Sequence, residues 1–249
     1  MKRLLVLIGL LFSAGVVFAD DPPQLRVLTY NIHHGEGLDG KFDYERLARV
    51  IADLNPDLVA LQEVDRKTDR AAGVDQADLL GELTGMKVAY GRAMYYGGGE
   101  YGQTVLSRFP ILESKTHPLP FRSGYEPRAA QAAVIRPDNG LPDLLLINTH
   151  LCHRDEEIRV EQIQHMIDLF AEEKSHPVIL AGDLNARPGS PSIDLVTTKW
   201  ENTLGEQARI DYVLVRPRDG WKVVEVKIVD ERVVSDHKPV LVTLEWNRQ

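Results

Sequence analysis

The chain has 249 residues, of which 43% are hydrophobic and 27% charged, and its formal net charge is −8. The hydrophobic fraction can fill a large core, which excludes a disordered, collagen-like or coiled-coil protein. The acidic balance argues against a protein that coats nucleic acid with a broad basic face. The single cysteine excludes a disulfide framework and a cysteine-built zinc site.

The first 19 residues have the pattern of a secretory signal peptide. Lys2 and Arg3 precede an apolar stretch over residues 4–18, and Val17-Phe18-Ala19 resembles a small-x-small cleavage site. The apolar stretch is short for a membrane span, although an uncleaved N-terminal anchor is the alternative interpretation. We therefore expect a secreted or periplasmic protein without stable membrane insertion, folded as a single domain over residues 20–249.

Short apolar runs alternate with amphipathic segments along that domain. The predicted strands are residues 25–30, 57–62, 143–148, 178–181, 210–215, 223–229 and 240–246, with a β-meander over residues 90–136. Asp43, Asp75 and Asp155 each precede a helical pattern as a cap, and Asn55-Pro56 and His176-Pro177 end the first and third helices. The two halves of the chain resemble each other, which favours two sheets, each with its helices on one face, packed as a sandwich.

Polar residues follow the predicted strands in both halves. Asn31 and Glu63 are 32 residues apart, and Asn148 and Asp183 are 35 residues apart, with a helix between the members of each pair. We expect these strand ends to meet at one rim of the sandwich. Each residue alone is also typical of a turn, a solvated loop or a structural histidine.

Together these residues fit the hydrolysis of a phosphate ester. Mg²⁺ prefers one or two carboxylates with neutral oxygens and water, which Glu63, Asn31 and Asp236 can provide. His237 is the natural proton acceptor near pH 7, and the carboxylate of Asp211 can fix its tautomer. The donors for developing negative charge are expected to be His150 and Asn185.

Seven motifs in order carry a resemblance to a known family. They are TYNIHHG (29–35), LQEVD (61–65), YGQTVLSR (101–108), NTHL (148–151), GDLN (182–185), RIDYVL (209–214) and SDHKP (235–239). The set resembles the endonuclease/exonuclease/phosphatase superfamily, which includes DNase I-like nucleases, sphingomyelinases and inositol-polyphosphate phosphatases. The resemblance covers nearly the whole predicted domain. It implies an α/β fold, a four-layered α/β/β/α sandwich of two mixed β-sheets, and a phosphoesterase that depends on Mg²⁺, with Mn²⁺ as the alternative.

The resemblance also implies roles for individual residues. Glu63 is the expected principal metal ligand, with Asn31 beside it and Asp236 as a carboxylate on the metal side. Asp183 and Asn185 are expected to orient the attacking water and contact the phosphate. His237 and Asp211 form the expected histidine–carboxylate pair, and either Asp183 or His237 takes the proton from water. His150 is expected to contact the phosphate or act as an acid, and His33 and Tyr101 are candidate phosphate contacts.

Some positions depart from the family pattern or stay open. Many relatives carry Asn where this chain has Gln103, and Cys152 stands near two histidines without the spacing of a zinc site. Arg66, Arg70 and Arg128 are candidates for a basic rim that binds a substrate's phosphate or carboxylate, with solvated surface charges as the alternative.

We expect a phosphodiester or phosphomonoester substrate, a small molecule or lipid head group in preference to nucleic acid, and a monomeric protein. The acidic charge makes an endonuclease the weaker alternative, because tight DNA binding needs many Lys and Arg contacts to phosphates. A non-catalytic binding protein on the same scaffold is a further alternative.

Overall fold

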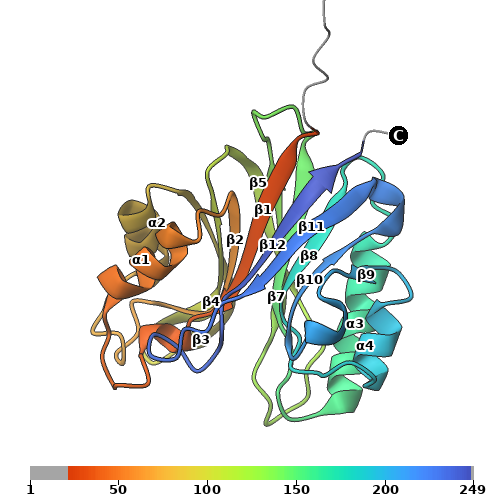
Figure 1. Ribbon diagram of the computed structural model, residues 1–249. Coiled ribbons are helices and arrows are strands. Elements are labelled where there is room, and N and C mark those ends of the chain that lie inside the picture. Colours follow the sequence, from red (N-terminus) through yellow and green to blue (C-terminus); the bar gives the residue numbers. More distant parts are fainter. Residues whose placement is uncertain (1–21, 248–249) are drawn as a thin grey trace, which may run out of the picture.

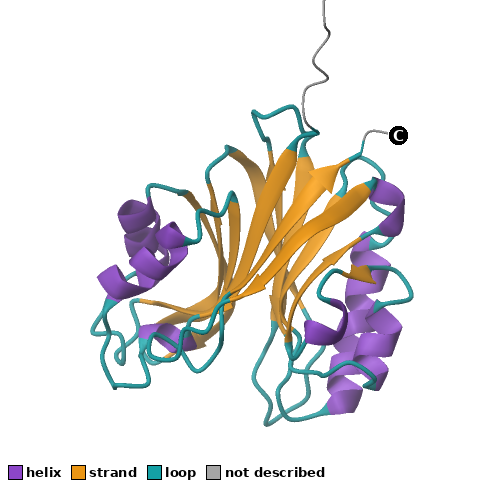
Figure 2. Ribbon diagram, in the orientation of Figure 1, coloured by secondary structure: helices purple, strands orange, loops and turns teal. Residues whose placement is uncertain are grey.

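Two six-stranded β-sheets lie face to face in the computed structural model, and helices cover their outer faces (Figures 1 and 2). The structure describes residues 22–247, so the predicted signal peptide lies outside the described residues. The first sheet has the order β11-β12-β1-β2-β4-β3 and the second has the order β5-β6-β7-β8-β10-β9. The expected α/β sandwich of two mixed sheets flanked by helices is confirmed.

The strands of the first sheet are β1 (Gln24–Asn31), β2 (Leu58–Arg66), β3 (Lys87–Tyr96), β4 (Gly99–Ser107), β11 (Trp221–Ile228) and β12 (Val240–Trp246). Those of the second are β5 (Ile111–Pro118), β6 (Ala129–Ile135), β7 (Leu144–His150), β8 (Val178–Asp183), β9 (Glu201–Asn202) and β10 (Asp211–Val215). In each sheet one neighbouring pair is parallel, β1 with β2 and β7 with β8, and the other pairs are antiparallel.

The helices are α1 (Tyr44–Asp53) and α2 (Gln76–Thr84) against the first sheet, and α3 (Glu156–Phe170) and α4 (Pro191–Val196) against the second (Figure 1). The three expected caps are present: side-chain oxygens of Asp43, Asp75 and Asp155 each accept from a backbone N–H in the first turn of α1, α2 and α3. Within residues 22–247, no helix is both long enough and apolar enough to cross a membrane.

The predicted division into two half-chain sheets is wrong. β5 and β6 belong to the predicted meander over residues 90–136, before the second set of strands, but join the second sheet, because β6 pairs with β7. β11 and β12 come last but join the first sheet, because β12 pairs with β1 in antiparallel register, Leu28 opposite Leu241. Each sheet is therefore completed by strands from the other half of the chain.

Two element boundaries also differ from the prediction. β2 does not end before Glu63 but continues to Arg66, with a bulge between Gln62 and Val64. The third helix ends at Phe170, before His176-Pro177. The segment that follows turns back because the buried guanidinium of Arg216 donates to the carbonyl oxygens of Glu173 and His176.

The main core lies between the sheets and under α3 and α4, and a second core lies under α1 and α2. A polar bridge crosses the main core near the site end of the sheets. The side-chain amide of Asn148 on β7 donates to the backbone oxygens of Leu61 (2.9 Å) and Thr104 (3.0 Å) on the first sheet. Gln62 on β2 donates back to Asn148 Oδ1 (2.8 Å), so the two sheets are held in one relative position.

Candidate active site

A polar cavity of about 350 Å³ opens where the strand ends of the two sheets meet. It receives Glu63 from β2, His150 from β7, Asp183 from β8 and His237 from the loop between β11 and β12. In the parallel pair β7–β8, His150 lies opposite Asp183. The structure thus brings together strand ends that are far apart in the sequence.

Glu63 reaches the cavity because it sits at the bulge of β2. Its φ is +57°, in the left-handed region that a non-glycine residue seldom adopts, and such strain is typical of functional positions. Burial raises the pKa of this carboxyl. His34 Nδ1, which lies 3.7 Å from Oε2, the Asn31 amide and the charge of Arg128 lower it by more than burial raises it, so the net pKa is well below its usual range. Glu63 is therefore a carboxylate at any ordinary pH.

Asn31 joins two carboxylates. Its Nδ2 donates to Glu63 Oε1 at 3.0 Å and to Asp183 Oδ2 at 3.1 Å, while its Oδ1 accepts from the backbone N–H of His33. Asn31 thus bridges Glu63 and Asp183 as a hydrogen-bond donor, and its expected place beside the metal ion stays a prediction.

Nitrogen atoms of four residues lie around the carboxylate of Asp183. Besides Asn31, its Oδ2 lies 3.5 Å from His150 Nε2 and 3.6 Å from His237 Nε2, and its Oδ1 accepts from the backbone N–H of Asn185 at 2.8 Å. Burial and the charge of Asp211 raise the pKa of Asp183 above its usual value, against the opposing effects of His237, Asn185 and Asn31.

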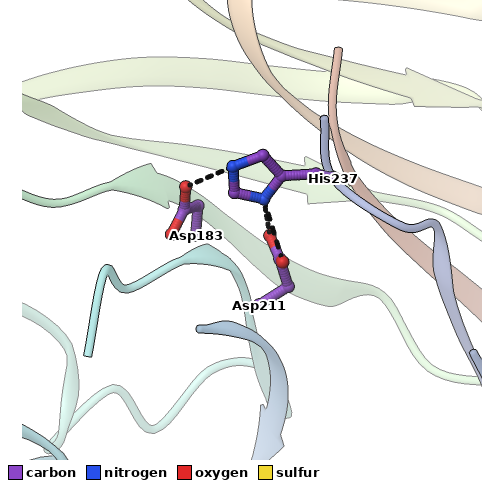
Figure 3. A group of neighbouring side chains, drawn as sticks. All are labelled: Asp183, Asp211 and His237. Carbon is purple, nitrogen blue, oxygen red and sulfur yellow. Dashed lines mark hydrogen bonds and ion pairs between the residues drawn. The ribbon is translucent and has the colours of Figure 1, made fainter. Parts of the chain in front are cut away.

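The imidazole of His237 lies between two carboxylates (Figure 3). Its Nδ1 is 3.0 Å from Asp211 Oδ2, and its Nε2 faces Asp183. Burial lowers the pKa of His237, but the hydrogen bond and charge of Asp211 and the charge of Asp183 outweigh it and raise the pKa to about 9. The three residues have ligand atoms close enough for a metal ion. However, the two nitrogens of one ring point in different directions, so the geometry matches a hydrogen-bonded relay better than a shared ion.

His150 is held in one tautomer by Arg128. Arg128 Nη1 lies 2.8 Å from His150 Nδ1, and because a guanidinium can only donate, Nδ1 must accept and the proton is on Nε2. Burial and the neighbouring charge of Arg128 hold the pKa of His150 well below its usual value. A neutral imidazole therefore directs an N–H towards Asp183.

The remaining predicted residues divide into two groups. His33, Tyr101, Asn185, Asp236, Arg70 and Arg128 line the same cavity. Arg66 does not, because its side chain turns to Asp75 (2.6 Å) and Glu100 outside it. Gln103 is buried and donates to the Ala129 carbonyl, so it connects β4 to β6 without lining the cavity.

The residues of the cavity region that the sequence did not predict include His34, Asp65 and Tyr96. His34 lies between Glu36 and Glu63, and its buried Nδ1 has no hydrogen-bond partner among the described residues. The repeated histidine of the NIHHG motif is a signal that could have identified it. Asp65 stands in the LQEVD motif, which could have identified it, whereas Tyr96 looks like an ordinary strand residue and had no such signal.

The donor set fits a hard divalent cation. Glu63, Asp183 and Asp236 present carboxylate oxygens to one cavity, and Glu63 is ionised while buried, which suits Mg²⁺. Glu63 and Asp236 are the residues that would hold the ion.

Comparison with known proteins identifies the class. The model of the endonuclease/exonuclease/phosphatase family matches residues 28–237, and the chain belongs to this family. Members of the family are phosphoester hydrolases and generally use a divalent metal ion.

The individual relatives have low sequence identity to this chain. The chain is 27% identical over 205 residues to an inositol phosphosphingolipids phospholipase C of Schizosaccharomyces pombe, covering 71% of this chain and 44% of that protein. It is 27% identical over 176 residues to the uncharacterized protein YbhP of Escherichia coli, covering 65% of this chain and 67% of that one. The crystal structure of an endonuclease/exonuclease/phosphatase from Beutenbergia cavernae matches with a TM-score of 0.74 and 26% identity, over 90% of this chain and 72% of that one.

Proposed function

We propose that this protein is a Mg²⁺-dependent phosphoesterase that hydrolyses its substrate by attack of an activated water. The observation that carries the proposal is the convergence of Glu63, Asp183 and His237 in one cavity. A buried carboxylate, a proton-accepting pair and fixed N–H donors are the groups that phosphoester hydrolysis requires.

The proton of the attacking water is taken by the Asp183–His237 pair. Asp211 accepts from Nδ1–H of His237, and Nε2 of the same ring faces Asp183 Oδ2 at 3.6 Å, so the proton released by the water goes to one of these two side chains. Because the groups are strongly coupled, the pair titrates as a unit and the proton is assigned to the pair.

The other groups orient the substrate. Asn31 and the backbone N–H of Asn185 fix the carboxylate of Asp183, and the Nε2–H of His150 is available to a phosphoryl oxygen. Glu63 and Asp236, with Asn31 beside them, would hold Mg²⁺, or Mn²⁺ in its place, and the cation would supply positive charge that offsets the charge of the phosphoryl oxygens.

We further propose that the substrate is a small phosphoester or a lipid head group. A cavity of about 350 Å³ suits a single head group, and the net charge of −8 disfavours a tight nucleic-acid binder. The similarity to a phospholipase C that is named for inositol phosphosphingolipids supports the same choice.

The test is hydrolysis of a panel of phosphoesters, including sphingomyelin, inositol phosphates, cyclic nucleotides and DNA, with Mg²⁺. Glu63→Ala, Asp183→Ala and His237→Ala are each expected to reduce the rate by about 100-fold or more. Asp168→Ala, which removes an exposed carboxylate on α3, is the matched control and should act like the wild type. EDTA should abolish the activity and Mg²⁺ restore it. Activity that survives all three site substitutions would refute the site.

Two features of the whole chain are part of the proposal. Residues 1–19 act as a cleaved signal peptide, so the mature monomer is a single domain over residues 20–249 that is secreted or periplasmic. Amino-terminal sequencing of exported protein should then begin at Asp20, whereas a retained Met1 would contradict cleavage.

A further inference from the structure

Arg70 is fixed in the cavity wall by a buried carboxylate. Its Nε and Nη2 donate to Asp65 Oδ2 (2.5 Å) and Oδ1 (2.8 Å), and Asp65 is completely buried. Thr68 Oγ1 donates to the same carboxylate at 2.7 Å. Two parallel hydrogen bonds to one carboxylate hold the plane of a guanidinium in a single orientation.

Aromatic rings and the surrounding backbone hold the same group. The Arg70 guanidinium carbon is 4.6 Å from the ring centre of Tyr96 and 5.5 Å from that of Tyr101. The loop that carries Arg70 is fastened to the β3–β4 hairpin, since the backbone N–H of Asp69 donates to the Gly97 carbonyl at 2.7 Å. Gly97 and the next residue, Gly98, have φ of +49° and +76°, the conformation of a tight two-residue hairpin turn. Arg70 and Tyr96 are therefore set in place before any ligand arrives.

The third nitrogen of Arg70 remains available. Nη1 makes no hydrogen bond within residues 22–247, and 30% of the side chain is exposed into the cavity that holds Glu63. Glu126, the other carboxylate on this side of the cavity, is already bound by Arg128 Nη2 at 2.7 Å. Proteins bind phosphate groups with arginines held in this way, with the guanidinium fixed in one orientation and an N–H edge left free to donate.

The free N–H edge of Arg70 lies apart from the proposed reacting centre at Glu63. Asp65, which holds Arg70, lies two residues beyond Glu63 on β2, past the bulge between Gln62 and Val64. Tyr101 lies between them. The Arg70 guanidinium carbon is 5.5 Å from its ring centre, and its hydroxyl is close enough to Glu63 and Arg128 for their charges to shift its pKa. A ligand held by Glu63 and by Arg70 must thus carry two separate polar groups.

We propose that Arg70, clamped by Asp65 and stacked on Tyr96, is a second anion subsite, and that the substrate carries a second phosphate group besides the phosphoester that is hydrolysed. The inference rests on the proposed function, because the first subsite is the catalytic centre. Tyr96, which is 43% exposed, provides a flat face for the part of the substrate between the two phosphates.

The experiment measures binding without turnover. Dissociation constants for fructose 6-phosphate and fructose 1,6-bisphosphate, and for phosphate and pyrophosphate, are obtained by calorimetry in EDTA and again with Mg²⁺. Within one of these pairs the added phosphate is expected to tighten binding to the wild type by about tenfold or more. Citrate, a multivalent carboxylate, tests whether the subsite also accepts carboxylates. If citrate binds equally well, the second group is any anion and the phosphate assignment is overturned.

The variants separate Arg70 from the rest of the fold. Arg70→Gln leaves Asp65 unpaired, so the decisive protein is the double variant Asp65→Asn/Arg70→Gln, checked by its thermal unfolding. It should lose the gain from the second phosphate and retain the affinity for a single phosphate. Arg92→Gln is the matched control, because Arg92 also stacks on a tyrosine of the hairpin (Tyr95, 4.0 Å) but does not line the cavity.

The outcomes distinguish the two proposals. Glu63→Gln should abolish hydrolysis but keep the gain from the second phosphate, which would support the subsite independently of catalysis. A double variant that still binds the bisphosphate more tightly, or a wild type that gains nothing in either pair, overturns the subsite and leaves the phosphoesterase intact. A wild type that hydrolyses no phosphoester refutes the proposed function, while the binding comparison still reports on Arg70.

Discussion

Asp183 receives hydrogen bonds and ion-pair contacts from residues that lie far apart in the sequence. Asn31 comes from β1, His150 from β7 and His237 from the last interstrand loop, and each directs a nitrogen at Asp183 Oδ2. This explains why burial does not leave the carboxylate unpaired. Asp211 supports this arrangement, because its hydrogen bond to Nδ1 fixes the direction in which the ring of His237 faces.

Replacing Asp211 should change how His237 titrates. In Asp211→Asn the hydrogen bond and charge that raise the pKa of His237 to about 9 are weakened, so that pKa should fall towards or below 6.5. Because the folded pKa lies above the ordinary one, the contact stabilises the fold fully below about pH 6.5, and this stabilisation is lost as the pH rises through about 9. NMR titration of the imidazole in EDTA measures the pKa. An unchanged pKa would contradict the role of Asp211, and His117, which is remote on β5, serves as the internal control.

At the level of elements, strands and helices followed from the sequence where pattern and caps agreed. The cap residues Asp43, Asp75 and Asp155 each accept the expected hydrogen bond. The short helix α4 was not predicted, because its six residues offer less than two turns of periodicity. Sheet membership could not be predicted from a local pattern either, because it depends on which distant strand supplies the partner.

The candidate site, like the membership of the sheets, could be predicted only in part from the sequence. The strand ends predicted its main residues, but the direction of an individual side chain depended on the bulge in β2. Past this bulge Asp65 points inwards to Arg70, whereas Arg66 turns out to Asp75. A single inserted residue reverses the alternation of faces along a strand, and the sequence does not mark where that happens.

The cap of α3 gives a prediction for one element. Asp155→Ala removes the acceptor for the Ile158 N–H (3.1 Å) and also the partner of the Tyr125 hydroxyl, and should lower the free energy of unfolding by about 1 kcal/mol. Asp168→Ala in the last turn of the same helix is the control, since its exposed hydrogen bond from Gln164 is offset by an acidic group that opposes the helix dipole, so the net change should be small. Urea unfolding of both proteins makes the comparison, and equal stability of the two would show that the cap contributes little.

For the whole molecule, the polar bridge between the sheets is the feature that fixes their relative position. Asn148 contacts the first sheet at three points, and Gln62 is its reciprocal partner. Since Glu63 follows Gln62 directly and His150 lies two residues after Asn148, the bridge also sets the spacing of the catalytic groups on the two sheets.

Removing the bridge should therefore affect the entire fold. Asn148→Ala removes three buried hydrogen bonds between the sheets, two to backbone oxygens and one from the amide of Gln62, and should reduce the free energy of unfolding by about 3 kcal/mol or more. Asn139→Ala, which removes an exposed amide that donates to the Gln24 carbonyl, should change it by less than about 1 kcal/mol. Chemical denaturation measures both, and a stability loss in Asn148→Ala no larger than in the control would mean that the sheets are positioned by apolar packing alone.

The pairing of β1 with β12 has a consequence for the order in which the protein becomes active. On the ribosome β1 is made early, yet its antiparallel neighbour β12 and the loop with His237 are made more than two hundred residues later. Until that last hairpin docks, Glu63 and Asp183 have no proton-accepting partner and the cavity lacks one wall. Under the proposed function, a nascent or partly unfolded chain is thus catalytically silent, and hydrolysis begins only when the first and last strands have met.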